Sequence, residues 1–237
     1  MSIKTNLAIG TFSAVLAVIA GLGFTPSIRA QNPEMQEKVA AVKAAMAANK
    51  QALAQYTWVE QDTISIKGEQ KKQEHFQVVL GPDGKPQKTS LDAPPQESGR
   101  EGRLKKHIIE KKTEEYKDYA DQIKALIQKY VPPEKDLIQQ AQQQGNLMIG
   151  PEGEDLKLTI SNYLKSGDNM TMIVDKTEMG LKSLSISTYL NDQSDSVNVT
   201  VQFSRIPGGP NHVSSETING VSKQLTIAVQ NSNYQHQ

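Results

Sequence analysis

The chain has 237 residues, with 26 basic and 26 acidic side chains, and this balance argues against a general nucleic-acid binder, which needs a basic surface. It contains no cysteine, which excludes disulfides, thiol catalysis and cysteine-ligated zinc. Aromatic residues make up 5% of the chain and include a single tryptophan, which disfavours a carbohydrate platform of stacked rings.

Residues 1–30 are typical of an export signal. Lys4 gives a positive start, an apolar stretch runs from Leu7 to Phe24, and Ala30 is a small residue suited to cleavage. The apolar stretch also reaches the length of about 18 residues at which a membrane-spanning helix becomes feasible, so an uncleaved anchor is the alternative. We expect cleavage near Ala30 and a periplasmic or secreted mature protein without a transmembrane segment.

Residues 34–55 carry apolar side chains at helical spacing among many alanines, which predicts an amphipathic helix. From residue 56 the period of the apolar residues changes to two, as in a half-buried strand, and Trp58 and Ile64 share one parity. A second strand around Phe76 and Val78 and a short third strand near residues 86–91 complete a predicted antiparallel meander.

Residues 92–102 have the composition of a linker, and a highly charged helical pattern follows them. Pro132 and Pro133 end this helix and can open the next one, near residues 133–144. We therefore expect one half-barrel domain, residues 31–237, with a helical insertion at about residues 101–144.

The remaining sequence alternates strongly from Leu156 to Val229, with polar and mostly uncharged residues on the opposite parity. This alternation is typical of an antiparallel sheet with one face packed inward and one face in water. Turn residues separate the strands, including Asn219-Gly220. The predicted fold class is α+β, with a curved antiparallel sheet, an incomplete barrel, wrapped around two or three helices.

Catalytic and metal-binding motifs are missing from the sequence. The histidines are far apart, and neither a Gly-x-Ser-x-Gly elbow nor a phosphate-binding glycine loop occurs. The acidic residues from Glu114 to Asp121 are interpreted as the solvated face of the charged helix. We therefore predict no enzyme activity, no catalytic residue, no metal and no cofactor.

A basic cluster stands at the start of the charged helix, at Arg100, Arg103, Lys105 and Lys106. Cations at a helix N-terminus oppose the helix dipole, so this placement favours an anionic partner. The alternative is a solubilising patch beside a linker.

Three consecutive apolar residues, Leu147, Met148 and Ile149, lie between glycine- and proline-containing segments that are predicted to be loops. They are either tucked against the core or form a mobile flap over an apolar cavity.

The order of export signal, helix, "YTWVEQDTISIKG", helical insertion and final strands resembles the periplasmic lipoprotein-carrier superfamily, which includes the Lol carrier and acceptor proteins and RseB-type half-barrels. The stretch "MTMIVDKTEMGLKSLSIST" is similar to strand pairs of that group. The chain is also similar to a group of exported bacterial proteins with "QYTW", "GPDGK", "YVPP" and "NSNYQ". The resemblance implies an incomplete barrel whose apolar interior accepts acyl chains.

We therefore expect noncatalytic binding of a hydrophobic or amphiphilic ligand, such as a lipid or a lipoprotein acyl chain, in a half-barrel cavity. Trp58 is either a core plug or a wall of this cavity. The alternative is a cell-envelope interaction module that holds a protein or an anionic polymer through the polar sheet face or the basic cluster. The candidate cavity residues are Trp58, Ile64, Phe76, Val78, Leu147, Met148, Ile149, Met170 and Met172.

Overall fold

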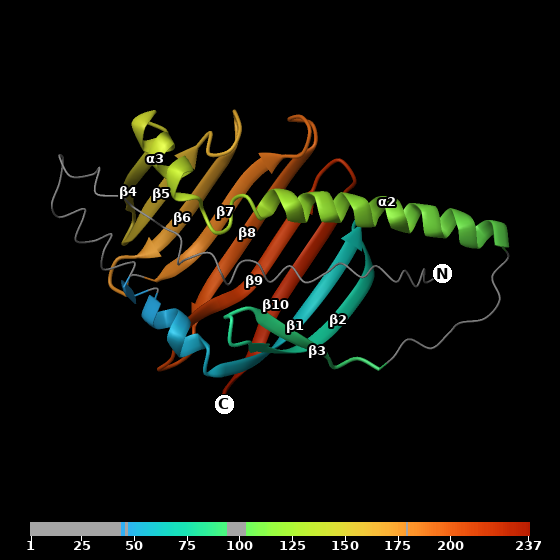
Figure 1. Cartoon of the computed structure of the whole chain (residues 1–237), viewed down its shortest axis with the longest axis horizontal. Helices are drawn as coiled ribbons and strands as arrows, with labels where there is room; N and C mark the ends of the chain where they lie inside the picture. Colours follow the sequence, from blue (N-terminus) through green and yellow to red (C-terminus); the bar gives the residue numbers. More distant parts are fainter. Residues whose placement is uncertain (1–43, 46, 94–102, 179) are drawn as a thin grey trace.

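The computed structural model describes residues 44–45, 47–93, 103–178 and 180–237, with the side chains of residues 103–112 left out. Ten strands form one antiparallel sheet in the order β3-β2-β1-β10-β9-β8-β7-β6-β5-β4 (Figure 1). The first three strands are β1 (Tyr56–Ile66), β2 (Glu69–Leu80) and β3 (Pro86–Ser90). The others are β4 (Leu147–Glu152), β5 (Asp155–Ser161), β6 (Asn169–Asp175), β7 (Leu181–Tyr189), β8 (Ser196–Arg205), β9 (Asn211–Gly220) and β10 (Leu225–His236).

Every strand pairing except one joins strands that follow each other in the sequence; the exception is β1 with β10. The helices α2 (Arg103–Ile127) and α3 (Lys135–Gln143) carry the chain from the edge strand β3 to the opposite edge strand β4, and α2 crosses one face of the sheet (Figure 1). We call this face the inner face. None of the described helices is long and apolar enough to cross a membrane.

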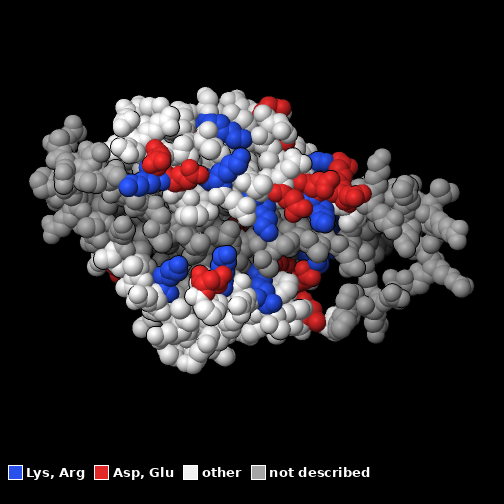
Figure 2. Space-filling view, in the orientation of Figure 1, with Lys and Arg blue, Asp and Glu red and all other residues white. Residues whose placement is uncertain are grey.

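Surface charges of both signs are interspersed on the described part of the molecule in this view, and they do not separate into areas of one sign (Figure 2). The outer face of the sheet is polar, as the alternation predicts, with Ser185, Ser187 and Thr200 exposed. The predicted α+β class with a curved, open antiparallel sheet is confirmed by this arrangement.

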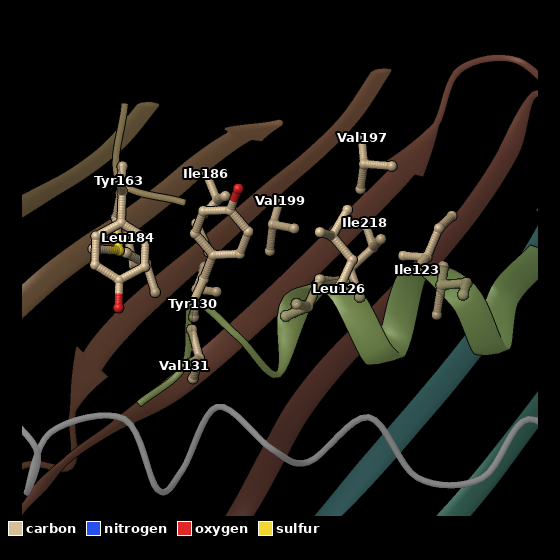
Figure 3. Close-up of a cluster of buried hydrophobic side chains, with 14 of the residues drawn as sticks. Ile123, Leu126, Tyr130, Val131, Tyr163, Leu184, Ile186, Val197, Val199 and Ile218 are labelled. Carbon is tan, nitrogen blue, oxygen red and sulfur yellow. The ribbon is translucent and has the colours of Figure 1, made fainter. Parts of the chain in front are cut away.

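The core lies between α2 and the inner face. Ile123 and Leu126 of α2 face Ile218 of β9 and the valines of β8, as Figure 3 shows. Beyond the helix end, Tyr130 lies against β7, close to Ile186 (Figure 3). The apolar stripe of the charged helix therefore seals the middle of the sheet.

A buried carboxylate anchors the segment that follows α2. Asp168 Oδ2 accepts hydrogen bonds from the Tyr130 hydroxyl at 2.6 Å and from the amides of Leu164 and Lys165, each at 2.9 Å. Its other oxygen accepts from the Tyr163 amide at 2.6 Å. A buried charge is tolerated when it is hydrogen-bonded in this way, so Asp168 ties α2 to the turn before β6.

Several predicted boundaries agree with the structure, and two are wrong. Lys67 and Gly68 form the turn between β1 and β2, with φ of 53° and 76°, as a two-residue hairpin turn requires. Helix is present at residues 44–45 and 47–53, whereas residues 34–43 of the predicted first helix and the cleavage site at Ala30 lie outside the described residues.

The first correction concerns Leu147, Met148 and Ile149, which are in the edge strand β4 and not in a loop. Gly150 and Pro151 lie inside this strand, where an edge position tolerates proline. The second concerns Asn219-Gly220, which ends strand β9; the turn follows at residues 221–224. Position 220 needs a glycine because α2 packs closely against it: a Cβ atom there would lie 2.5 Å from Cε1 of Tyr119.

We predict that Gly220→Ala destabilises the fold by roughly 1–3 kcal/mol, because the added methyl group overpacks the contact between α2 and β9. The Cβ would also lie 2.7 Å from Cδ1 of Ile123. The matched control is Gly150→Ala in β4, where a Cβ meets nothing within 4 Å. Urea unfolding of both variants should show a lower midpoint for Gly220→Ala alone, and equal midpoints would contradict the packing described.

We also predict that Asp168→Asn lowers the free energy of unfolding by about 2 kcal/mol or more, because an amide offers one acceptor oxygen where the buried carboxylate offers two. Asp192→Asn is the control, since Asp192 accepts hydrogen bonds from Ser194 in an exposed turn. Thermal unfolding monitored by circular dichroism measures both. Equal losses would show that Asp168 does not anchor the segment after α2.

Candidate functional site

The first half of β1 places charged side chains on the inner face of the sheet. Successive residues of a strand point to opposite faces, so Trp58, Glu60 and Asp62 share a face with Ile64, which belongs to the hydrophobic core. Trp58 is 0% exposed and Glu60 is 2% exposed. Acidic groups in such a position are unusual, because burial of a charge is costly.

The neighbouring strands add further polar side chains beside them. Asp62 pairs with Val229 of β10, and Val229 pairs with Glu216 of β9, which is 4% exposed. Glu60 pairs with Asn231 of β10. We call the following residues the polar cluster: Trp58, Glu60, Asp62, Lys88, Glu216, Asn231 and Tyr234.

One buried lysine pairs with two of the three carboxylates. The Lys88 ammonium group, from the edge strand β3, forms ion pairs with Glu60 and, at 3.4 Å, with Asp62. It also lies 5.2 Å from the centre of the Phe76 ring. Because three carboxylates face one ammonium group, the polar cluster has an excess of negative charge when all its groups are ionised.

Burial is the main cause of upward pKa shifts at both glutamates. Burial raises the pKa of Glu216 to about 8; the negative charges of Glu60 and Asp62 contribute in the same direction, and Lys88 opposes them. Burial likewise raises the pKa of Glu60 to about 7, although Lys88 lowers it and Asp62 raises it. Both glutamates therefore retain protons close to neutral pH.

Unsatisfied hydrogen-bonding atoms concentrate in the polar cluster. Among the buried side chains that the structure describes, four atoms have no hydrogen-bond partner, and all belong to this cluster: Trp58 Nε1, Asp62 Oδ1, Glu216 Oε1 and Asn231 Oδ1. A buried polar group without a partner costs about 1–3 kcal/mol. Three acceptors and one donor at one place therefore mark a site for the polar groups of a ligand.

Aromatic rings border the polar cluster on one side. Trp58 stacks on Tyr234 with ring centroids 5.5 Å apart, and Tyr234 contacts the His212 ring at 3.9 Å. The Tyr234 hydroxyl donates to the Val213 carbonyl at 3.1 Å. Burial raises the pKa of Tyr234 and lowers that of His212, so both stay neutral near pH 7.

An apolar area continues directly from the polar cluster. Glu216 pairs with Val201 of β8 on one side and with Val229 on the other, and both valines are buried. Val201 in turn pairs with Leu184 of β7, and Leu184 with Met172 of β6. The inner face is thus apolar across β6 to β8 and polar where β9, β10 and β1 meet.

The candidate cavity residues do not form one group. Ile64, Met170 and Met172 belong to the hydrophobic core. Trp58 and Val78 are fully buried beside the polar cluster, where Val78 pairs with both Trp58 and Lys88. Phe76, half-buried, lies under the Lys88 ammonium group.

The other three candidates are on β4, at the edge of the sheet remote from β3. Leu147 is half-buried against the core, whereas Met148 is 61% exposed and Ile149 is 37% exposed.

The candidates for an anionic partner stay a prediction. Arg100 lies outside the described residues, and Arg103, Lys105 and Lys106 belong to the first turns of α2, whose side chains are not described.

Sequence reasoning missed the carboxylates of the polar cluster, although part of the signal was available. Glu60 and Asp62 have the same parity as Trp58 and Ile64, so their inward direction could have been inferred. Glu216 was harder to find, because a bulge at Ser214 shifts the parity of β9 between Val213 and Glu216.

A second candidate site is a surface hollow of about 440 Å³ between the helical residues before β1 and the β8–β9 turn. Its lining includes Asn49, Tyr56, Arg205 and His236. The Arg205 guanidinium group is already paired with Glu178 at 2.6 Å. This hollow lacks buried polar atoms without partners among the described residues, so the polar cluster is the stronger candidate.

Comparison with known proteins yields no match to a family model and no match among curated proteins. Among solved structures, the chain is similar to a LolA superfamily protein from Nitrosomonas europaea, with a TM-score of 0.38, 5% identity, and coverage of 83% of this chain and 93% of that one. It is also similar to a DUF1329 family protein from Desulfovibrio piger, with a TM-score of 0.40, 11% identity and coverage of 84% and 93%.

A third similar structure is an outer membrane lipoprotein-sorting protein domain from Vibrio parahaemolyticus, with a TM-score of 0.42, 7% identity and coverage of 87% and 94%. The first and third belong to the group that the sequence layout resembles. At these identities and scores, the function of this chain has to be inferred from its own residues.

The polar cluster predicts a pH dependence of stability. The unfolded chain releases the Glu216 proton near its ordinary pKa of 4.5, whereas the folded protein keeps it up to about pH 8. Between these values the folded state binds more protons, so stability falls as pH rises, by about 1.4 kcal/mol per pH unit for one proton. Above pH 8 this contribution is constant.

Glu216→Gln should remove this loss of stability with rising pH, because glutamine does not titrate. We expect the variant to gain stability relative to the wild type as the pH is raised from 5 to 8, measured by urea unfolding at each pH. The groups around Glu216 that also titrate or carry charge are Glu60, Asp62, Lys88 and Tyr234. Glu152→Gln, at an exposed ion pair with Lys157, is the control and should follow the wild type. If the free energy of unfolding changes with pH in the same way in the wild type and in Glu216→Gln, the raised pKa of Glu216 is contradicted.

Proposed function

We propose that this protein is an exported, noncatalytic binder of an amphiphilic ligand, a lipid or an acyl chain with a polar head, on the inner face of its half-barrel. One observation carries the proposal: the buried polar atoms without partners gather at one end of an otherwise apolar face. The head of the ligand would contact the polar cluster, and its chain would contact the adjoining apolar side chains.

The apolar part supplies the affinity for a hydrocarbon chain. Val201, Leu184 and Met172 follow Glu216 across successive strands on the same face. All three belong to the hydrophobic core, so a bound chain would replace part of their present packing. Burial of a hydrocarbon chain contributes about 25 cal/mol per Å², reduced by the cost of association. Methionine adapts its shape easily to such a chain, which suits this lining to flexible ligands.

The polar part favours an amphiphile over a purely apolar ligand. A hydrocarbon in contact with the polar cluster would leave Asp62 Oδ1, Glu216 Oε1 and Asn231 Oδ1 without hydrogen bonds and away from water. A polar head satisfies these atoms, which makes its binding favourable at this position.

Binding is favoured over catalysis by the composition of the polar cluster. Its seven members include no serine, cysteine or histidine, so a Ser–His or Cys–His pair is absent among them. Lys88, the one amine, forms ion pairs with two carboxylates. The cluster is therefore suited to hold a polar group through its unpartnered acceptor atoms.

We expect the mature chain to copurify with an amphiphile, detected by mass spectrometry of an organic extract. We also expect added dodecyl amphiphiles to shift the emission of Trp58, the single tryptophan, because its ring lies in the polar cluster and stacks on Tyr234. The control is the double variant Trp58→Phe, Tyr189→Trp, which moves the reporter to the end of β7 and should not respond. A chain free of lipid whose Trp58 emission stays constant would contradict the proposal.

A further inference from the structure

We infer that the head group bound by the polar cluster is a primary ammonium, so that the ligand is a cationic amphiphile. This inference rests on the proposed function and specifies the chemistry of its ligand. Its basis is the geometry of three acceptor atoms, on Asp62, Glu216 and Asn231, that face the inner side of the sheet without partners.

Charge is the first reason. The polar cluster holds three carboxylates, and Lys88 forms ion pairs with Glu60 and Asp62. Glu216 is 4% exposed, and its Oε1 atom has no hydrogen-bond partner. An anionic head group, such as a carboxylate or a phosphate, would oppose the ionisation of Glu216, whereas a cation is compensated when Glu216 ionises beside it.

Hydrogen-bond chemistry is the second reason. A primary ammonium group has three N–H donors, which match the three acceptor oxygens; it offers no acceptor to the Trp58 indole N–H, the fourth atom without a partner. The strand register brings these oxygens into one neighbourhood: Asp62 and Glu216 flank Val229, and Asn231 is the next residue of β10 on that face. Strands are about 4.8 Å apart, so side chains from these positions can converge on one small group.

The aromatic border gives a third reason. Trp58 stacks on Tyr234 through one face, and the opposite face of an aromatic ring attracts cations and repels anions. A metal cation is a poorer match, because no group of three histidine, aspartate or glutamate side chains among the described residues is arranged to hold a metal ion. An organic cation with a long apolar chain fits both halves of the inner face.

The raised pKa of Glu216 agrees with this geometry. Burial and the charges of Glu60 and Asp62 keep the carboxyl group protonated near neutral pH when no additional cation is present. A bound ammonium group favours the ionised form of Glu216, so the cluster would exchange a proton for the ligand charge.

The test compares three probes with the same chain and different heads: dodecylamine, dodecanoate and dodecanol, titrated at pH 7 with Trp58 emission as the readout. We expect dodecylamine to bind at least about tenfold more tightly than dodecanoate, as one charge-assisted hydrogen bond provides. Glu216→Gln should lower dodecylamine affinity by about tenfold and leave dodecanol affinity unchanged. Glu152→Gln, on β4, is the matched control and should bind all three probes as the wild type does.

The outcomes separate this inference from the proposed function. Equal affinities for the three probes, or tightest binding of dodecanoate, would overturn the ammonium assignment and leave amphiphile binding in place. If none of the probes binds, amphiphile binding fails and the head-group assignment fails with it. The wild-type ranking is decisive by itself, so the test does not depend on the folding of the variant.

Discussion

The pairing of β1 with β10 is the constraint on which the site depends. It joins two meanders that are separated by the whole helical crossover, and it makes one sheet of them. Closure of such a long loop costs chain entropy that grows slowly with length, and the extended β1–β10 ladder offsets it. The polar cluster exists only because this pairing brings Glu60 and Asp62 beside Asn231 and Tyr234.

A local irregularity in that pairing determines where the aromatic rings lie. The register shifts between Thr57 and Val59, so that two residues of β10 oppose Trp58, and Asn233 has a φ of 53°. A bulge of this kind redirects the side chain that follows it. Tyr234 therefore points to the inner face and stacks on Trp58, where a regular strand would have placed it differently.

The two halves of the inner face are stabilised in different ways. On β5 to β9, the Tyr130–Asp168 hydrogen bond fixes the chain after α2, and the close approach of Tyr119 to Gly220 fixes α2 itself. These contacts satisfy the polar groups there and leave a well-packed apolar core. Where β9, β10 and β1 meet, three carboxylates face one lysine, and four buried polar atoms have no hydrogen-bond partner.

The sequence predicts the parts of this structure that depend on local periodicity. The alternation of β1 and of the C-terminal strands is visible because one face is apolar, and the α2 stripe is visible at Ala120, Ile123 and Ile127. Contacts between distant elements are not visible in this way. Asn219-Gly220 has the composition of a turn, yet Gly220 is in a strand because Tyr119 lies against it.

The candidate site was less predictable than the fold, because it depends on contacts between elements that are distant in the sequence. The apolar character of Trp58 and Val78 makes both of them candidates in the sequence; Trp58 belongs to the polar cluster and Val78 lies beside it. Lys88 and Glu216 become neighbours of Glu60 only through the order of strands β3, β2, β1, β10 and β9, which no local pattern specifies. A search for paired carboxylates in the sequence therefore finds the charged helix first.

Exchange of a proton for an ammonium head group is tested most directly by calorimetry of dodecylamine binding at pH 7 in buffers with different ionisation enthalpies. The observed binding enthalpy should vary with the buffer in the sense of proton release, because Glu216 has a pKa of about 8 in the free protein and ionises beside a bound cation. Glu216→Gln should release fewer protons than the wild type. A binding enthalpy independent of the buffer, or proton uptake, would contradict ammonium recognition by the polar cluster.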